Sequence, residues 1–379
     1  MRSLSIAAVA LISISAAPRV DAQGAISLEG LGYPTGQFSA RAEATGGGLA
    51  DFDALSLTTP ASLAGVGSAS LFLQYSPEFR KVTTSSGSAS TTTARFPLVE
   101  GVLPMGENWT LGLSSSTFLD RSLETSLKRL EVVGAATDTV TTTERNQVLG
   151  AINDIRLGLA WSKSPVFRIG VGGHVFAGSN RITLSQLFPD SSEFISNAQA
   201  GRISYAGFAA SLGIEFHPVR SIGFALSGRK GGDLRAESGD TLIGSGRIPD
   251  HYSASVIYEG IPGAAISARV AHDSWSSLGS LSATGIQAFD GWDTGAGIEA
   301  SGPRLFSRIV TVRVGARVRT LPFGYNGEKV SEKSVAAGFG VPLTRQRASF
   351  EFSAQRASRT AADIKERGFI LSFGLRVSP

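Results

Sequence analysis

The chain has 379 residues, of which 45 are glycine and none is cysteine. Hydrophobic residues make up 42% of it and charged residues only 17%, which is too apolar for a disordered chain. The lack of cysteine excludes disulfides, iron–sulfur clusters and thiolate zinc sites. A net charge of +4, spread along the chain, argues against a nucleic-acid partner. The length fits two or more soluble domains or one large barrel.

The N-terminus has the pattern of an export signal. Arg2 precedes an apolar stretch from Leu4 to Ala17, which is shorter than the roughly 20 residues of a membrane-spanning helix. Residues 20–22 read Val-Asp-Ala, so we expect cleavage after Ala22; the alternative is a buried N-terminal helix. Export without cysteine is typical of a bacterial envelope protein. No later segment is long and apolar enough for a membrane helix, which leaves a soluble periplasmic protein, a secreted β-solenoid or an outer-membrane barrel.

Beyond about residue 66, apolar and polar residues alternate. In residues 369–377 every second position is Phe, Leu or Val, and the positions between them are Ile, Ser, Gly and Arg. Because successive strand side chains face opposite sides, this pattern predicts strands with one apolar face. It recurs in four further stretches, and the apolar face of all five carries no Asp, Glu, Lys or Arg. The other four are 154–161, 167–175, 207–216 and 310–318.

The pattern predicts fourteen strands, an even number, as in bacterial outer-membrane barrels. They lie near residues 67–78, 91–104, 108–119, 148–163, 166–178, 202–216, 220–234, 248–259, 263–275, 290–301, 307–320, 331–342, 346–358 and 365–378. Short turns are expected at 105–108, 163–165, 217–220, 259–263, 302–306 and 343–346, and longer polar connections at 79–90, 120–147, 179–201, 235–247, 276–289, 321–330 and 359–364. Short periplasmic turns that alternate with long outer loops indicate an outer-membrane barrel.

Two residue types support this interpretation. Aromatic residues near strand ends are expected to form two interfacial girdles. They are Trp109, Trp161, Phe167, Phe216 and Tyr258 beside the short turns, and Tyr205, Tyr252, Trp275 and Trp292 beside the long connections. Glycine at inward positions leaves room for a ligand, a plug or strand curvature. These positions are Gly158, Gly170, Gly172, Gly207, Gly213, Gly223, Gly295, Gly297 and Gly315.

Residues 23–66 do not alternate and are rich in small residues. The runs at 39–42, 46–50, 53–56 and 59–64 resemble the N-terminal hatch of the FadL/TodX family, outer-membrane transporters of long-chain fatty acids and other hydrophobic compounds. Thr59-Pro60-Ala61 stands where that family typically has Asn-Pro-Ala, and residues 97–104, 154–161 and 170–172 are similar to its strands. The resemblance implies an all-β fold, a transmembrane antiparallel β-barrel of fourteen strands with the hatch in its lumen. We therefore expect a signal peptide at 1–22, a hatch at 23–66 and a barrel at 67–379.

The resemblance also implies a route for a ligand. Outer loops capture it, a lumen pocket receives it, and it leaves sideways through a gap in the wall. Apolar residues are candidates for capture, with self-packing of the loops as the alternative. They are Leu184, Leu187, Phe188, Phe194 and Ile195, together with Leu123, Leu127 and Leu130 at helical spacing. Inward arginines are candidates for binding a carboxylate, with an internal ion-pair network as the alternative. They are Arg156, Arg168, Arg313 and Arg317, with Arg269 as a fifth, and the network would include Asp154, Glu215, Glu299 and Glu351.

No catalytic motif accompanies the histidines. His174, His217, His251 and His272 lie in neither an H-E-x-x-H nor a G-x-S-x-G setting. We therefore expect no enzyme, no cofactor and no metal. The prediction is a monomeric barrel in contact with the lipid of a bacterial outer membrane, which takes up small hydrophobic molecules such as long-chain fatty acids. The alternatives are a structural or secretion-accessory barrel similar to the PorV branch of the same fold, favoured by a filled lumen, and a general porin, favoured by a continuous polar pore.

Overall fold

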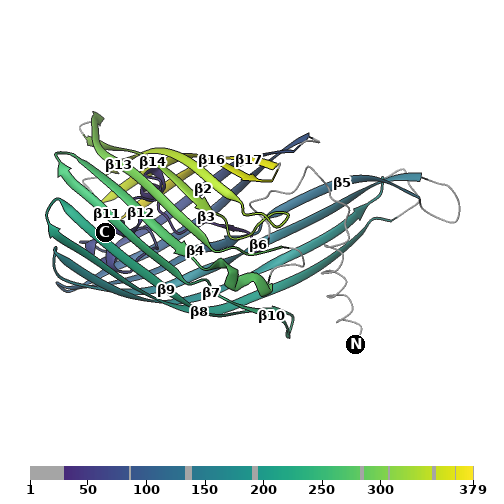
Figure 1. Cartoon of the computed structure of the whole chain (residues 1–379), viewed down its shortest axis with the longest axis horizontal. Coiled ribbons are helices and arrows are strands. Elements are labelled where there is room, and N and C mark those ends of the chain that lie inside the picture. Colours follow the sequence, from purple (N-terminus) through teal and green to yellow (C-terminus); the bar gives the residue numbers. More distant parts are fainter. Residues whose placement is uncertain are drawn as a thin grey trace.

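The computed structural model describes residues 30–84, 87–132, 139–189, 195–281, 286–305, 308–343, 347–362 and 364–378. The expected signal peptide and the first residues of the expected hatch lie outside these ranges. Fourteen antiparallel strands form a closed barrel in which each pairs with the next, and the last pairs with the first (Figure 1). They are β2 (Ser70–Thr84), β3 (Gly87–Met105), β4 (Trp109–Asp120), β6 (Thr139–Ser164), β7 (Phe167–Leu187), β8 (Asn197–Val219), β9 (Ile222–Ser238), β11 (His251–Ile261), β12 (Ala264–Asp273), β13 (Gly291–Leu305), β14 (Arg308–Thr320), β15 (Ser331–Leu343), β16 (Ala348–Ala361) and β17 (Ile364–Val377). The predicted all-β fold, an antiparallel barrel of fourteen strands, is confirmed.

Three neighbouring strands are much longer than predicted. β6, β7 and β8 have 26, 21 and 23 residues, about twice what a membrane-spanning strand needs. Together with β5 (Leu123–Val132) they project beyond the rest of the barrel (Figure 1). Much of the expected loops 120–147 and 179–201 is therefore strand, and the helical spacing expected for residues 123–130 is wrong because β5 pairs with β6. Polar residues on both faces of these extensions hide the alternation from the sequence.

Two other predicted connections are shorter than expected. β10 (Thr241–Arg247) folds back on β9 within the expected loop 235–247. β16 ends at Ala361 and β17 begins at Ile364, so most of the expected connection 359–364 is strand. Residues 276–289 include the end of a short helix, η4 (Trp275–Leu281). Among the described residues, no helix has the length and apolar character needed to cross a bilayer.

The outer surface of the barrel carries an apolar belt, as the alternation predicts. Leu157 and Phe208 are 55% and 68% exposed, whereas Arg156, next to Leu157, is buried. Two expected girdle residues are an exception, because Tyr205 and Trp275 are buried in an internal cluster with Phe118 and Phe176. Uncharged outward faces are found on the stretches that the sequence singled out, but outward positions elsewhere on β2 and β15–β17 carry lysine and arginine.

Residues 30–69, here called the N-terminal segment, cross the inside of the barrel (purple in Figure 1). The helix α2 (Ala40–Ala44) contacts β14–β17, whereas the short helix η3 (Ala61–Gly65) contacts β4, β6, β7 and β8. A third turn, η2 (Ala50–Phe52), contacts β9. Most side chains of the segment are buried, so it fills much of the lumen.

Glycines of the barrel wall make room for this segment on two sides. A Cβ atom at Gly170 would lie 2.5 Å from the Pro60 carbonyl carbon, and one at Gly158 would lie 2.8 Å from Leu63. On the opposite wall, a Cβ atom at Gly297 would lie 2.6 Å from Thr45 Cα. Of the predicted inward glycines, six face the N-terminal segment (Gly158, Gly170, Gly213, Gly295, Gly297 and Gly315), and Gly172, Gly207 and Gly223 face other parts of the chain. These six glycines thus leave room for the N-terminal segment inside the barrel.

Candidate functional site

The barrel wall is interrupted between β3 and β4. The backbones of these strands pair from Leu98–Ser116 to Met105–Trp109. Beyond Leu98, the described residues of the two strands form no backbone pair. The pairing edge of β4 at Leu119 and Asp120 is taken instead by β1 (Tyr33–Pro34) of the N-terminal segment. We call the interruption the seam.

Gly36 lies in the seam. A Cβ atom on it would be 2.6 Å from the Pro97 carbonyl oxygen of β3 and 2.8 Å from the Thr117 carbonyl oxygen of β4. Its φ of +80° is a left-handed conformation that favours glycine. The chain therefore passes between the two strands where only a residue without a side chain fits.

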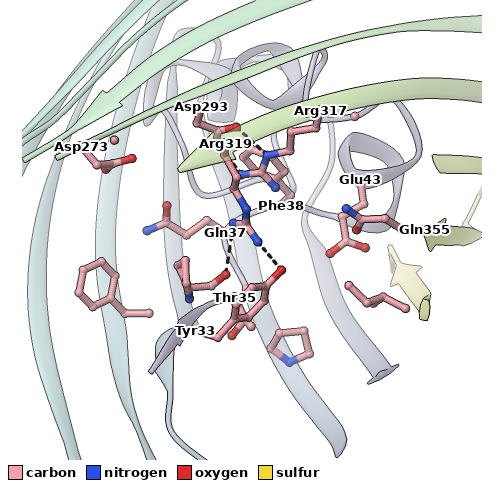
Figure 2. Close-up of a pocket in the computed structure, with 18 of the residues that line it drawn as sticks. Tyr33, Thr35, Gln37, Phe38, Glu43, Asp273, Asp293, Arg317, Arg319 and Gln355 are labelled. Carbon is pink, nitrogen blue, oxygen red and sulfur yellow. Dashed lines mark hydrogen bonds and ion pairs between the residues drawn. The ribbon is translucent and has the colours of Figure 1, made fainter. Parts of the chain in front are cut away.

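A cavity of about 100 Å³ lies in the lumen beside the seam (Figure 2). Residues 33–38 form one side of it, and Pro97 and Phe118 of the seam strands line it as well. Its lining is mixed. Aromatic residues (Tyr33, Phe38, Phe118, Trp275 and Trp292) alternate with charged ones (Glu43, Glu78, Arg95, Arg269, Asp273, Asp293, Arg317 and Arg319). The cavity thus offers both flat apolar surfaces and charged groups.

The arginines predicted to bind a carboxylate all have carboxylate partners within the barrel. Arg156 pairs with Glu100 at 3.1 Å, Arg168 with Glu215 at 2.6 Å, Arg313 with Glu299 at 2.5 Å and Arg317 with Asp293 at 2.6 Å. Glu351 is a second partner of Arg313. Of the four, Arg317 lines the cavity (Figure 2). Their role toward a ligand stays a prediction, and the alternative network is present.

The apolar capture residues lie away from the cavity. Leu184 and Leu187 are on the projecting end of β7, and Phe188 directly follows it. Phe194 lies outside the described residues, and nothing in the cavity lining comes from this region. Leu187 is on the outward face, with 39% of its surface exposed.

The turn Thr59-Pro60-Ala61 forms the start of η3. The Ala61 amide donates to Thr59 Oγ1 at 3.3 Å, and the Ser62 hydroxyl donates to the Thr59 carbonyl at 3.0 Å. Thr59 therefore closes this turn with its hydroxyl oxygen and is itself fully buried.

Three of the solved structures that resemble the chain match more than nine-tenths of it. A FadL homologue of Pseudomonas aeruginosa has 11% identity and a TM-score of 0.62, with 92% of this chain and 99% of that chain covered. The toluene transporter TodX of Pseudomonas putida has 12% identity and a TM-score of 0.59, with 91% and 98% covered. The monoaromatic hydrocarbon channel CymD has 13% identity and a TM-score of 0.55, with 94% and 99% covered.

The chain has the FadL fold. The predicted resemblance is thus confirmed in fold, over nearly the whole length of both chains. Because the sequence identities are only 11–13%, the likeness concerns the fold alone. No protein-family model matches the chain, and no curated protein matches its sequence.

In this FadL-fold barrel, Tyr33 ties the seam-covering residues to the opposite wall. Its hydroxyl donates to Glu332 Oε2 at 2.9 Å and accepts from Arg319 Nη2. The guanidinium groups of Arg319 and Arg359 lie 4.8 and 4.4 Å from the centre of its ring. Burial raises the pKa of Tyr33, although both arginines oppose the shift. This contact could not be predicted from the sequence, because its partners are about 300 residues apart and no local pattern links them.

A second cluster that the sequence did not predict joins Asp154, His174 and Ser211 on three neighbouring strands. His174 Nδ1 lies 2.8 Å from Asp154 Oδ1, and His174 Nε2 lies 2.8 Å from Ser211 Oγ. This is the hydrogen-bond order of a catalytic triad. The backbone of Ser211, however, is paired on both sides within the sheet, so it provides no oxyanion hole. We interpret the cluster as a link between strands.

Proposed function

We propose that the protein is a channel of the bacterial outer membrane through which small hydrophobic molecules enter. The apolar belt around the barrel suits contact with lipid on every side. Structures of the same fold include one described as a toluene transporter and one described as a monoaromatic hydrocarbon channel. The mechanism we propose is passive and needs no enzymatic step.

The observation that carries this proposal is the cavity beside the seam. A ligand in the cavity is separated from the outside of the wall by residues 33–36 and by the ion pair of Arg95 on β3 with Asp120 on β4, because the backbones of the described parts of β3 and β4 do not pair beyond Leu98. Displacing these residues breaks the short pairing of β1 with β4 and the hydrogen bonds of Tyr33 with Glu332 and Arg319, and it leaves the barrel ladder intact. A hydrophobic molecule can then pass sideways into the bilayer without crossing water.

The lining of the cavity suggests which ligands fit. Phe118 and Trp275 stack with their ring centroids 5.3 Å apart, and Phe38 lies under Arg317. These flat apolar surfaces favour small aromatic compounds. Long-chain fatty acids are the second proposed class, with Arg269 and Arg317 as the predicted arginines that line the cavity and could meet a carboxylate.

Two observations favour a second candidate function. The projecting sheet of β5–β8 is a broad surface beyond the barrel (Figure 1), and the mostly buried N-terminal segment fills much of the lumen. Both features suit a structural or secretion-accessory barrel. A general porin is disfavoured because the N-terminal segment crosses the lumen.

Locking the seam tests the proposal. Pro34 and Leu119 are Cα partners, a spacing that a disulfide can bridge, and the chain has no cysteine of its own. The double variant Pro34→Cys/Leu119→Cys, once oxidised, should stop the uptake of toluene and of oleate into cells, and reduction should restore it. The control Ala177→Cys/Ala206→Cys joins two wall strands at partner positions and should leave uptake normal. Equal uptake by locked and reduced protein would refute transport through the seam and leave the accessory role.

A further inference from the structure

The outward face of the barrel carries basic side chains that the proposed channel does not use. They are Lys81 on β2, Lys333 on β15, Arg356 on β16, and Lys365 and Arg367 on β17. All five are exposed, and the residues on either side of each along its strand are buried, so all five point away from the lumen. None forms an ion pair with a residue that the structure describes. We call these five residues the basic patch.

The strand register brings the patch together. Arg367 and Lys81 are Cα partners across β17 and β2, and Ser358 of β16 is the partner of both Lys333 and Arg367. Arg356 lies one outward position below Ser358 on the same strand, and Lys365 lies one above Arg367. Directly opposed side chains have Cβ atoms about 5 Å apart. Five positive charges therefore lie on four adjacent strands.

The acidic residues of these strands point the other way. Glu78, Glu332 and Glu366 are buried on the lumen side. There they pair with arginines that also point inward, namely Arg80, Arg319 and Arg359. Like charges directly opposite each other, such as Arg367 and Lys81, destabilise a sheet. An anion from outside the chain would remove this cost.

The position of the patch indicates which anion. The next outward positions toward the short turns are Phe79, Val335 and Phe369, all exposed and part of the apolar belt. The patch thus borders the belt at the end of the barrel from which β5–β8 project. Long lysine and arginine side chains at such a border reach from the apolar layer to the headgroups.

We propose that the basic patch binds the phosphate groups of lipid headgroups in the adjoining leaflet. The guanidinium groups of Arg356 and Arg367 can each donate two hydrogen bonds to one phosphate, while the lysines act as point charges. The proposal rests on the placement of the barrel in a membrane and not on transport through the seam.

Lipid retention tests this site. Wild-type protein is reconstituted in nanodiscs of phosphatidylcholine with or without lipid A, a glucosamine lipid with two phosphates, and the bound lipid is counted by native mass spectrometry. The variant Lys81→Gln/Lys333→Gln/Arg367→Gln should retain lipid A on the order of tenfold less well. The control Lys163→Gln/Arg220→Gln/Arg347→Gln removes the same charge from exposed positions near the short turns and should retain it like wild type.

Two results would overturn the proposal. One is equal retention of lipid A by the patch variant and the control, which would leave the patch to an acidic protein partner or to no partner. The other is displacement of lipid A by inorganic phosphate at equal concentration, which would make the site one for free anions. Heat-modifiable migration on gels confirms that the variant is folded. Uptake of toluene by the patch variant should stay normal, so failure of this proposal is distinguishable from failure of the channel.

Discussion

Gly213 on β8 faces Thr59 of the N-terminal segment so closely that a Cβ atom on the glycine would overlap the threonine hydroxyl. The η3 turn therefore rests on the bare backbone of the wall. On the side of α2 the segment also fits against wall glycines, such as Gly297 and Gly315, and there it is held by charge as well, with Arg41 bonded to Glu299 at 2.7 Å.

Adding one methyl group at position 213 should loosen the plug. We expect Gly213→Ala to destabilise the protein by about 1–3 kcal/mol, because Thr59 has to move out of its place. Denaturant unfolding in detergent measures this difference. Gly173→Ala on the neighbouring strand is the control, since nothing lies within 4 Å of a Cβ atom there. Equal stability of the two variants would show that the fit at Gly213 does not matter.

The ion-pair network on the lumen side should contribute strongly to the free energy of unfolding of the barrel. Arg359 is fully buried and pairs with Glu78, Glu332 and Glu366 at 2.9, 2.6 and 2.5 Å. Arg359→Met leaves these carboxylates short of a partner, and we expect a loss of about 3–5 kcal/mol. Arg356→Met lies on the same strand but faces outward, so its effect on unfolding should be small. Similar losses in both variants would contradict the network.

Glu43 of α2 should make the protein more stable in acid. Burial raises the pKa of its carboxyl group, although hydrogen bonds from Ser372 and Ser353 oppose the shift. A carboxyl whose pKa is higher in the folded state contributes fully below its unfolded pKa, about 4.3, and loses this contribution as the pH rises through the folded pKa.

Replacing this carboxyl group tests whether ionised Glu43 lowers the stability of the folded protein. At pH 7, Glu43→Gln should be more stable than wild type in denaturant unfolding, because no charge is buried, and near pH 4 the two should be equal. Glu107→Gln in an exposed turn should change little at either pH. A variant less stable than wild type at pH 7 would mean that the ionised carboxylate is favoured where it lies.

The orientation of the barrel can be read from cysteine labelling. Ile195 is 90% exposed next to the projecting end of β8, and Arg220 is exposed in the short turn between β8 and β9. On intact cells, a maleimide that does not cross membranes should label Ile195→Cys, and Arg220→Cys should react only after permeabilisation. The reverse labelling pattern would show that the barrel has the opposite orientation in the membrane.

Ser211 should be unreactive despite its hydrogen bond to His174. We expect a fluorophosphonate probe not to label the purified protein, because the site has no oxyanion hole that would stabilise the attack. Mass spectrometry of the peptide that carries Ser211 measures this. Labelling that Ser211→Ala and His174→Ala both abolish would show an active nucleophile and refute the interpretation as a strand link.

The sequence by itself determined the type of barrel and its two faces. Alternation has a period of two and is local, so the fourteen strands could be counted, and Leu157 and Arg156 could be assigned to opposite sides. The lack of alternation up to residue 66, with its small residues, likewise predicted a separate segment before the first strand. The extensions of β6–β8 could not be found this way, because outside the lipid both faces of a strand are polar.

Only the tertiary structure decided which residues meet in the lumen. Whether an inward arginine meets a ligand or a carboxylate depends on register between strands, as with Arg313 and Glu299, and register is set by pairing along whole strands. Tyr33 and Glu332 are 299 positions apart, and only closure of the barrel brings them together. The seam and the basic patch arise in the same way, from which residues of separate strands lie side by side.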